Sequence, residues 1–195
     1  MIIRRYQSED EQGWLRCRVL SFLDTAYFDN VLQAKESYEN PSIELVVLED
    51  DMVVGLMDIE YEKEPNTVCA RGNGRGGMIW HVATHPDYQR RGYGERLLKE
   101  AEKLARELEI DYLEAWTRDD QWVNLWYEKF GFEKFQTYLH VVAVGNDEVG
   151  KLVDQKKGYS TLQAFAHYNG TEVDEVKNSF TRVHECNGYA KTLRN

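Results

Sequence analysis

The sequence is short of positive charge and of long apolar runs, and each shortage excludes a class of protein. Its 195 residues hold 24 Lys and Arg against 34 Asp and Glu, which gives a formal net charge of −10. A nucleic-acid-binding protein needs a basic face, so this balance argues against that class and suits a cationic or neutral substrate. No stretch approaches the roughly 18 apolar residues of a membrane span. Residues 1–6 lack the apolar region of a signal peptide.

Cysteine is too scarce for a disulfide framework. Cys17, Cys69 and Cys186 are an odd number without metal-type spacing, so the sequence predicts a reduced, cytoplasmic protein. The histidines have no ligand-type spacing with cysteine, so no metal is predicted. These histidines are His81, His85, His140, His167 and His184. A composition that is 42% hydrophobic and 30% charged is typical of a globular domain, and the length suits one domain.

The hydrophobic pattern predicts an α/β fold with a mixed sheet, because hairpin signals alternate with a crossover helix. Apolar and β-branched runs predict strands over 2–6, 43–48, 52–61, 78–84, 112–117, 132–144 and 182–193. Helical periodicity and capping residues predict helices over 8–23, up to about 38, over 92–108, from 119 or 120 to 131, and near 173–180. We divide the chain into a core, 1–144, and a C-terminal extension, 145–195, that completes the same domain.

Two glycine-rich segments compete for a phosphate-binding role. Residues 72–77 satisfy G-x-G-x-x-G but run into a strand, so we expect a mobile loop there. Residues 89–94 instead lie between a strand and the start of the strongest helix. Free backbone N–H groups and the positive end of the helix dipole make such a start an anion site. Gly92 and Gly94 allow close backbone approach, and neighbouring arginines add positive charge.

Two motifs carry a family resemblance. Residues 82–98 (VATHPDYQRRGYGERLL) closely resemble the acetyl-CoA-binding motif of the GNAT family of N-acetyltransferases, and 126–132 (WYEKFGF) match that family's second signature. The resemblance covers residues 78–135 and fades beyond Val144. It implies the GNAT acyl-CoA N-acyltransferase fold, with splayed central strands, and acetyl-CoA as co-substrate.

The resemblance also implies the residues that contact acetyl-CoA. Backbone groups of Val82, Ala83 and Thr84 are expected to pair with the pantetheine arm, and one of these N–H groups polarises the thioester carbonyl. A second set is expected to hold the pyrophosphate through backbone N–H groups. This set is Gln89, Arg90, Arg91, Gly92, Tyr93, Gly94 and Glu95. Family members often carry a cofactor-contacting Asn where this chain has Asp120, so Asn124 is the substitute that we consider.

The implied catalytic residues are Tyr127 and His81. Tyr127 matches the tyrosine that often protonates the leaving thiolate, although an aromatic at this place also reads as core packing. His81 lies on the splayed strand, and an imidazole is a suitable general base, with Glu60 and Glu62 as alternatives. Its neighbour Trp80 sits where some relatives place the base.

The acceptor is expected to meet an acidic and aromatic wall. Tyr27, Phe28 and Asp29, together with Glu60, are the candidate acceptor-binding residues, because such a wall suits a protonated amine. The predicted reaction is acetyl transfer to a primary amine of a small molecule by direct attack. The alternatives are a protein acceptor (a lysine or an N-terminus) and a non-catalytic acyl-CoA sensor. No nucleic-acid or membrane partner is predicted, and the oligomeric state, a homodimer included, stays open.

Overall fold

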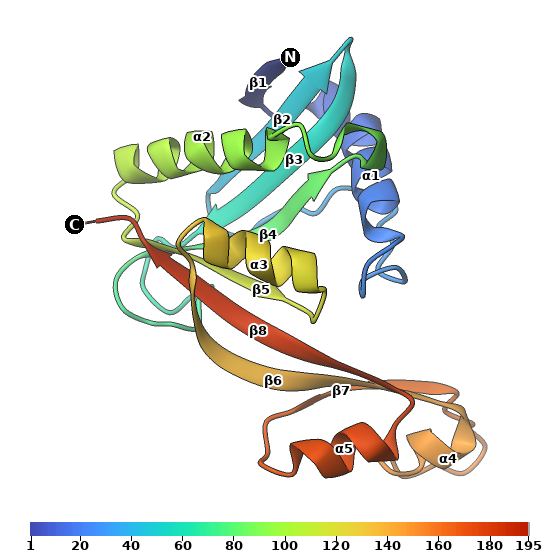
Figure 1. Ribbon diagram of the computed structural model, residues 1–195. Helices are drawn as coiled ribbons and strands as arrows, with labels where there is room; N and C mark the ends of the chain where they lie inside the picture. The colour runs from blue at the N-terminus through green and yellow to red at the C-terminus, as the bar shows by residue number, and fades with distance from the viewer. Residues whose placement is uncertain (195) are drawn as a thin grey trace.

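The computed structural model describes residues 1–194, and eight strands within that range form one sheet in the order β1-β2-β3-β4-β5-β8-β6-β7 (Figure 1). All neighbours pair antiparallel except β4 and β5, which are parallel. The strands are β1 (Ile2–Arg5), β2 (Ser42–Glu49), β3 (Met52–Tyr61), β4 (Gly76–Thr84), β5 (Tyr112–Thr117), β6 (Glu133–Val144), β7 (Gln163–Tyr168) and β8 (Arg182–Thr192). The mixed α/β sheet predicted from the sequence is therefore confirmed.

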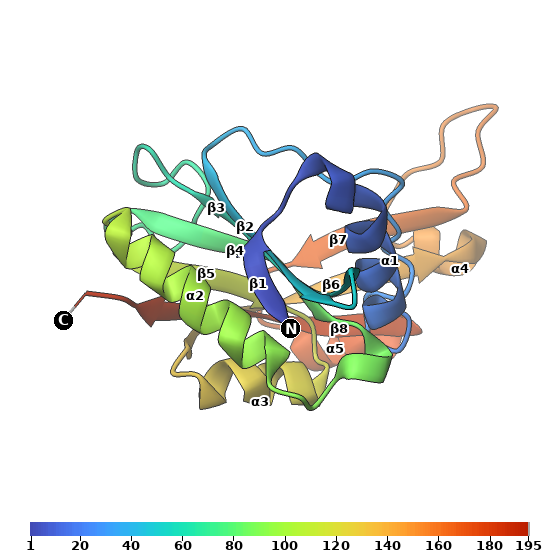
Figure 2. The same ribbon diagram turned by 90° about the horizontal axis from the view of Figure 1, so that it is seen from above.

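Helices cover both faces of the sheet (Figure 2). They are η1 (Ser8–Asp10), α1 (Glu11–Phe22), η2 (Pro86–Tyr88), α2 (Tyr93–Glu107), α3 (Gln121–Lys129), α4 (Gly145–Val149) and α5 (Val173–Ser179). On β3, Leu56 packs with Trp14 of α1, whereas Met57 packs with Leu97 of α2. Neighbouring residues of a strand point to opposite faces, so α1 and α2 lie on opposite sides of the sheet.

The central strands β4 and β5 separate half-way along β4. Their parallel pairing joins Gly76–Ile79 to Tyr112–Ala115 and ends there. At the same point β4 bulges against β3: Asp58 pairs with His81 and the next residue with Ile79. Trp80 is therefore the extra residue of the bulge, and it is 47% exposed. Beyond the bulge, Val82–Thr84 pair with β3 on one side, and no strand pairs with them on the other side.

Two segments differ from the sequence-based prediction. Residues 24–41 contain turns and bends but no helix, so the short helix expected to end near Tyr38 is wrong. Contacts to distant elements explain this: Lys35 N–H donates to Glu11 Oε1 and the Tyr38 hydroxyl donates to Asp58 Oδ2, at 3.0 and 2.9 Å. Such tertiary bonds outweigh helix propensity. The sequence also missed β7, which forms the edge of the sheet beside β6.

The C-terminal extension contributes to the main sheet. Strand β8 lies between β5 and β6, and it pairs with both of them along its length. The ends of β6 and β8 carry β7, α4 and α5 away from α1 and α2, at the bottom of Figure 1. No helix in residues 1–194 is both long enough and apolar enough to cross a membrane.

Candidate functional site

The loop that leads into α2 presents a row of unused backbone donors. The N–H groups of the six residues 90–95 donate to no acceptor within residues 1–194, and the first helical hydrogen bond is Arg96 N–H to Gly92 O at 3.1 Å. Positive φ angles at Arg90 and Gly92, +64° and +82°, fold the loop. Six free donors at the positive end of a helix dipole form an anion site. Gln89 lies outside it, because its N–H donates to Pro86 O at 3.3 Å.

The side chains of this loop stabilise its shape. The Arg91 guanidinium donates to Asp87 O at 3.0 Å and stacks on Tyr88. The Tyr93 hydroxyl donates to Glu49 Oε1 at 2.5 Å, and Glu95 pairs with a lysine one turn along α2. A Cβ added at Gly92 would meet no atom within 4 Å, so the space above the loop is open.

Strand β4 offers backbone groups to the opening between β4 and β5. His85 N–H donates to Val54 O of β3 at 2.9 Å, and backbone groups alternate in direction along a strand. The groups of Ala83 therefore point to β3, and those of Val82 and Thr84 point into the opening. Thr84 O already accepts from the Gln89 side chain at 3.3 Å.

Tyr127 lies inside the core on α3, and its hydroxyl makes no hydrogen bond with any residue in 1–194. Its ring stacks on Tyr189 at 5.5 Å between centroids and contacts Trp126 and Phe132 edge-on. Burial raises the pKa of the Tyr127 phenol, and the nearby Tyr27 phenol adds to that effect. The phenol is therefore a protonated donor at neutral pH.

His81 faces the opposite side of the sheet, towards α1. Its ring meets Trp14 edge-on at 5.1 Å. Arg18 Nε donates to His81 Nδ1 at 3.3 Å, and His81 Nε2 lies 2.5 Å from Glu36 Oε2. The side chain of His81 is buried and that of Glu36 is 47% exposed. The sequence did not single out Glu36, because it lies 45 positions from His81 in a segment without a motif.

The sequence of this region also matches a known protein family. Residues 41–134 match the family model described as the GNAT acetyltransferase domain. The chain carries a GNAT acetyltransferase domain. The family, the fold class and the acyltransferase class predicted from the sequence are thereby confirmed, and acetyl-CoA as co-substrate agrees with them.

Solved structures with low identity share the GNAT fold. The ribosomal-protein-alanine N-acetyltransferase of Brucella melitensis is 17% identical, with a TM-score of 0.60 and coverage of 98% of this chain and 99% of that one. YncA, a putative acetyltransferase of Salmonella typhimurium solved with acetyl-CoA, is 15% identical, with a TM-score of 0.59 and coverage of 100% and 95%. The N-acetylglutamate synthase of Neisseria gonorrhoeae, solved with coenzyme A and N-acetyl-glutamate, is 17% identical, with a TM-score of 0.55 and coverage of 100% and 35%. No curated protein sequence matches the chain.

Asn124 is fully occupied inside the GNAT domain. Its Nδ2 donates to Arg118 O and Asp120 O at 2.7 and 2.9 Å, and its Oδ1 accepts from Asn187 and Tyr189 at 2.9 and 3.0 Å. Two donors and two lone pairs are all that an amide has. The amide thus joins α3 to β8 and keeps nothing for a ligand. The Asp120 carboxylate instead accepts from Ala26 N–H.

The acidic and aromatic cluster expected to bind the acceptor is neutralised by arginines. Both Asp29 oxygens accept from Arg182, at 2.6 and 3.0 Å, and Arg182 also lies over the Phe28 ring. The Tyr27 hydroxyl accepts from Arg118 N–H at 3.1 Å, and the Arg118 guanidinium stacks on the Tyr27 ring. These residues hold the end of α1 against β5 and β8, so they offer little free negative charge.

The alternative bases are committed to the fold. Glu60 Oε1 accepts from the backbone and side chain of Asn40, and Glu60 Oε2 accepts from Trp80 Nε1 at 2.8 Å. Glu62 accepts from three backbone N–H groups, those of Val68, Cys69 and Gly76. In both carboxylates each oxygen already accepts at least one hydrogen bond within the fold.

The first glycine-rich segment is anchored rather than mobile. Backbone N–H groups of residues 70–71, Arg75 and Gly76 donate to the carboxylates of Glu114, Asp111 and Glu62. These donors already have acceptors, and the surrounding carboxylates repel phosphate. This segment is therefore excluded as the anion site, as the sequence predicted from its lack of a following helix.

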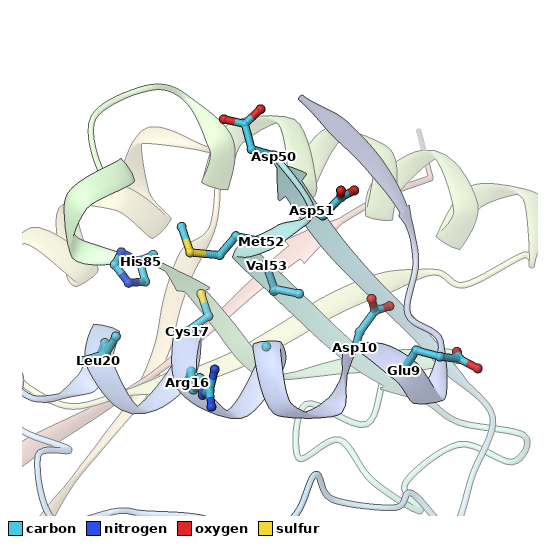
Figure 3. A pocket seen from close by; sticks show the side chains of 11 residues that line it. Glu9, Asp10, Arg16, Cys17, Leu20, Asp50, Asp51, Met52, Val53 and His85 are labelled. Carbon is cyan, nitrogen blue, oxygen red and sulfur yellow. The ribbon is translucent and has the colours of Figure 1, made fainter.

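Two hollows lie on the α1 side of the sheet. One, of about 490 Å³, borders the β4 bulge; Glu36, Ser37, Tyr38, Glu39, Asn40, Glu60, Thr67, Val68 and Trp80 line it. The other, of about 440 Å³, lies between α1 and the β2–β3 turn, where Figure 3 shows Cys17 pointing towards Met52. Only the first contains a residue in contact with His81, so it is the candidate acceptor site.

Proposed function

We propose that this protein transfers the acetyl group of acetyl-CoA to a primary amine of a small molecule by direct attack. The observation that carries the proposal is the row of six unused N–H groups of residues 90–95, which follows the part of β4 that no longer pairs with β5. Such a row fits a pyrophosphate, and an open strand edge fits an amide-bearing arm. Together they match the two polar parts of coenzyme A.

The reaction needs an oxyanion donor and a proton donor on the cofactor side. Backbone N–H groups of Val82 and Thr84 point into the opening, so either can polarise the thioester carbonyl. When the amine nitrogen attacks that carbon, the C–S bond breaks and sulfur leaves as a thiolate. In our proposal Tyr127 protonates this thiolate, since its hydroxyl has no other partner within residues 1–194. Water then restores the phenol proton.

A small cationic amine is favoured by the hollow at the β4 bulge. Its lining includes three carboxylates, of Glu36, Glu39 and Glu60, and two aromatic rings, of Tyr38 and Trp80, without any Lys, Arg or His. Carboxylates and aromatic faces attract an ammonium group. A protein acceptor is the second candidate, because one solved structure with this fold is named a ribosomal-protein-alanine N-acetyltransferase.

A panel of amines, assayed by release of free thiol from acetyl-CoA, tests the proposal. It should hold mono-, di- and polyamines, amino acids, a lysine peptide and peptides with free N-termini. Turnover with small amines and none with peptides is the expected result, and the reverse pattern would move the assignment to a protein acceptor. Coenzyme A binding measured by calorimetry without turnover of any amine would favour an acyl-CoA sensor.

A further inference from the structure

The hydrogen bonds of His81 fix which of its nitrogens carries the proton. A guanidinium has only donors, so Arg18 Nε–H, 3.3 Å from His81 Nδ1, needs a lone pair on that nitrogen. Arg18 cannot turn away, because both its Nη atoms donate to Asn30 at 2.8 Å. The ring proton of neutral His81 therefore sits on Nε2 and is donated to Glu36 Oε2 at 2.5 Å. His81 has no free lone pair with which to remove a proton from an amine.

Glu36 has what His81 lacks. One oxygen, Oε2, is held by His81, while the other, Oε1, has no hydrogen-bond partner among residues 1–194. The side chain is 47% exposed and lines the hollow next to Trp80. The carboxylate is thus fixed at one oxygen and open at the other, beside the strand that borders the cofactor opening.

The neighbouring carboxylates do not share this arrangement. Asp58 is fully buried, where it accepts from Lys35, Tyr38 and the Trp14 indole. Glu60 uses both oxygens within the fold. Glu39 lines the same hollow but is exposed and has no hydrogen bond in residues 1–194 that would fix its position.

We propose that Glu36 is the proton acceptor for the attacking amine and that His81 is the residue that positions it. The inference rests on the proposed acetyltransferase function. As the N–C bond forms, the N–H bond breaks and its proton passes to Glu36 Oε1. As the C–S bond breaks, the thiolate takes a proton from Tyr127. Glu36 then releases its proton to water and water returns one to Tyr127, so the products are the amide and the free thiol.

The charges around Glu36 keep it ionised. The largest cause of its lowered pKa is the hydrogen bond from His81 on β4. Arg18 on α1 and Lys35 in the same segment also face the carboxylate and lower its pKa. The other nearby carboxylate, Asp58 on β3, is neutralised by Lys35. The wild-type kcat should consequently show no acidic limb near pH 6.5, the ordinary pKa of an imidazole.

Glu36→Gln tests the proposal, because it keeps a carbonyl acceptor for His81 but cannot take a proton. We expect kcat to fall by about 10²–10³-fold, with KM for the amine changed by less than about threefold. The residual rate should rise about tenfold per pH unit as hydroxide replaces the carboxylate. Glu36→Asp should recover at least about tenfold of the loss. The matched control, Glu64→Gln, removes an exposed charge that lies outside the hollow and should leave kcat within about twofold.

Further readouts separate a chemical role from a structural one. Formate should rescue Glu36→Ala, because a small carboxylate can fill the space, and the melting temperature and coenzyme A affinity of all variants should stay near wild type. Unchanged kcat in Glu36→Gln, or a loss confined to KM, would overturn the proposal. A loss that is equal at all pH values and not rescued by formate would overturn it as well. Failure of the proposed function would look different, since the wild-type protein itself would release no thiol with any amine.

Discussion

Replacing Tyr127 by phenylalanine should lower the catalytic rate strongly and leave the stability of the fold nearly unchanged. The hydroxyl donates to no group in residues 1–194, so its removal costs no protein hydrogen bond, and the free energy of unfolding should change by less than about 1 kcal/mol. The ring keeps its stack on Tyr189 at 5.5 Å. Loss of a positioned proton donor typically costs 10²–10⁴-fold in rate, which corresponds to about 3–5 kcal/mol in the barrier.

The pH dependence of this variant follows from the same burial. The pKa of Tyr127 is raised above the usual value for tyrosine, because the charged phenolate is poorly solvated in the core. The protonated phenol is the active form, so the wild-type rate should not fall through loss of the Tyr127 proton below about pH 10. The assay is thiol release at saturating acetyl-CoA and amine between pH 7 and 9.5, with coenzyme A affinity measured in parallel.

Tyr189→Phe is the matched control, and we expect it to lower stability while leaving kcat nearly unchanged. The Tyr189 hydroxyl donates to Asn124 Oδ1 and Glu128 Oε1 at 3.0 and 3.1 Å. Its loss removes the hydrogen bond that joins β8 to α3 and should cost about 1–3 kcal/mol of stability, because one acceptor is charged, with kcat within about threefold. A Tyr127→Phe enzyme with near-normal kcat, or one destabilised as much as Tyr189→Phe, would refute the reasoning and leave Tyr127 as core packing.

Two further predictions concern the anion site and the core. Gly92→Val should weaken coenzyme A binding by about a hundredfold in calorimetry, because a branched side chain fills the open space above the free N–H groups. Gly145→Val has the same positive φ and the same open surroundings, so an equal loss there would mean that strain alone is responsible. Lys35→Met leaves the fully buried Asp58 without its cation, 2.9 Å away, and should cost about 3–5 kcal/mol in urea unfolding. Lys99→Met, in an exposed pair, should leave the urea midpoint unchanged, and equal midpoints for both variants would contradict the buried-pair argument.

The parts of the fold that are encoded locally could be predicted from the sequence. Helix α2 shows an uninterrupted apolar stripe, in which Leu97, Leu98 and Ala101 are buried as expected. The β2–β3 hairpin has an acidic turn, and Asp50 and Asp51 adopt the positive φ angles that such a turn needs. The loop with the unused N–H groups could be located because its signal lies in consecutive residues between a strand and a helix.

Features that depend on distant contacts could not be predicted. Glu36 lies in a segment whose local pattern predicts a helix, but it reaches its place through His81, 45 positions away. Asp29 reads as a free carboxylate in the sequence, but it pairs with Arg182, which is 153 positions away. A sequence pattern shows the type of a side chain and its local period. It does not show which of two opposite charges already has a partner.

The bulge at Trp80 affects both halves of the candidate site, namely the His81–Glu36 pair and the strand edge expected to receive acetyl-CoA. Alternation along an unbroken strand would place consecutive side chains on opposite faces. Here Trp80 reaches Glu60 on the face where His81 meets Trp14, while Ile79 and Val82 pack towards α2. The extra residue therefore places Trp80 on the same face as His81, beside Glu36. It also lies where the pairing of β4 with β5 ends, so the same residue opens the strand edge expected to receive acetyl-CoA. Deleting Trp80 should remove the bulge and leave the pairs Asp58–His81 and Ile59–Ile79 as they are, so His81 keeps its face while β4 straightens along β5. The strand edge should then close, and coenzyme A binding should be lost. Binding retained after the deletion would separate the two halves and show that the opening forms without the bulge.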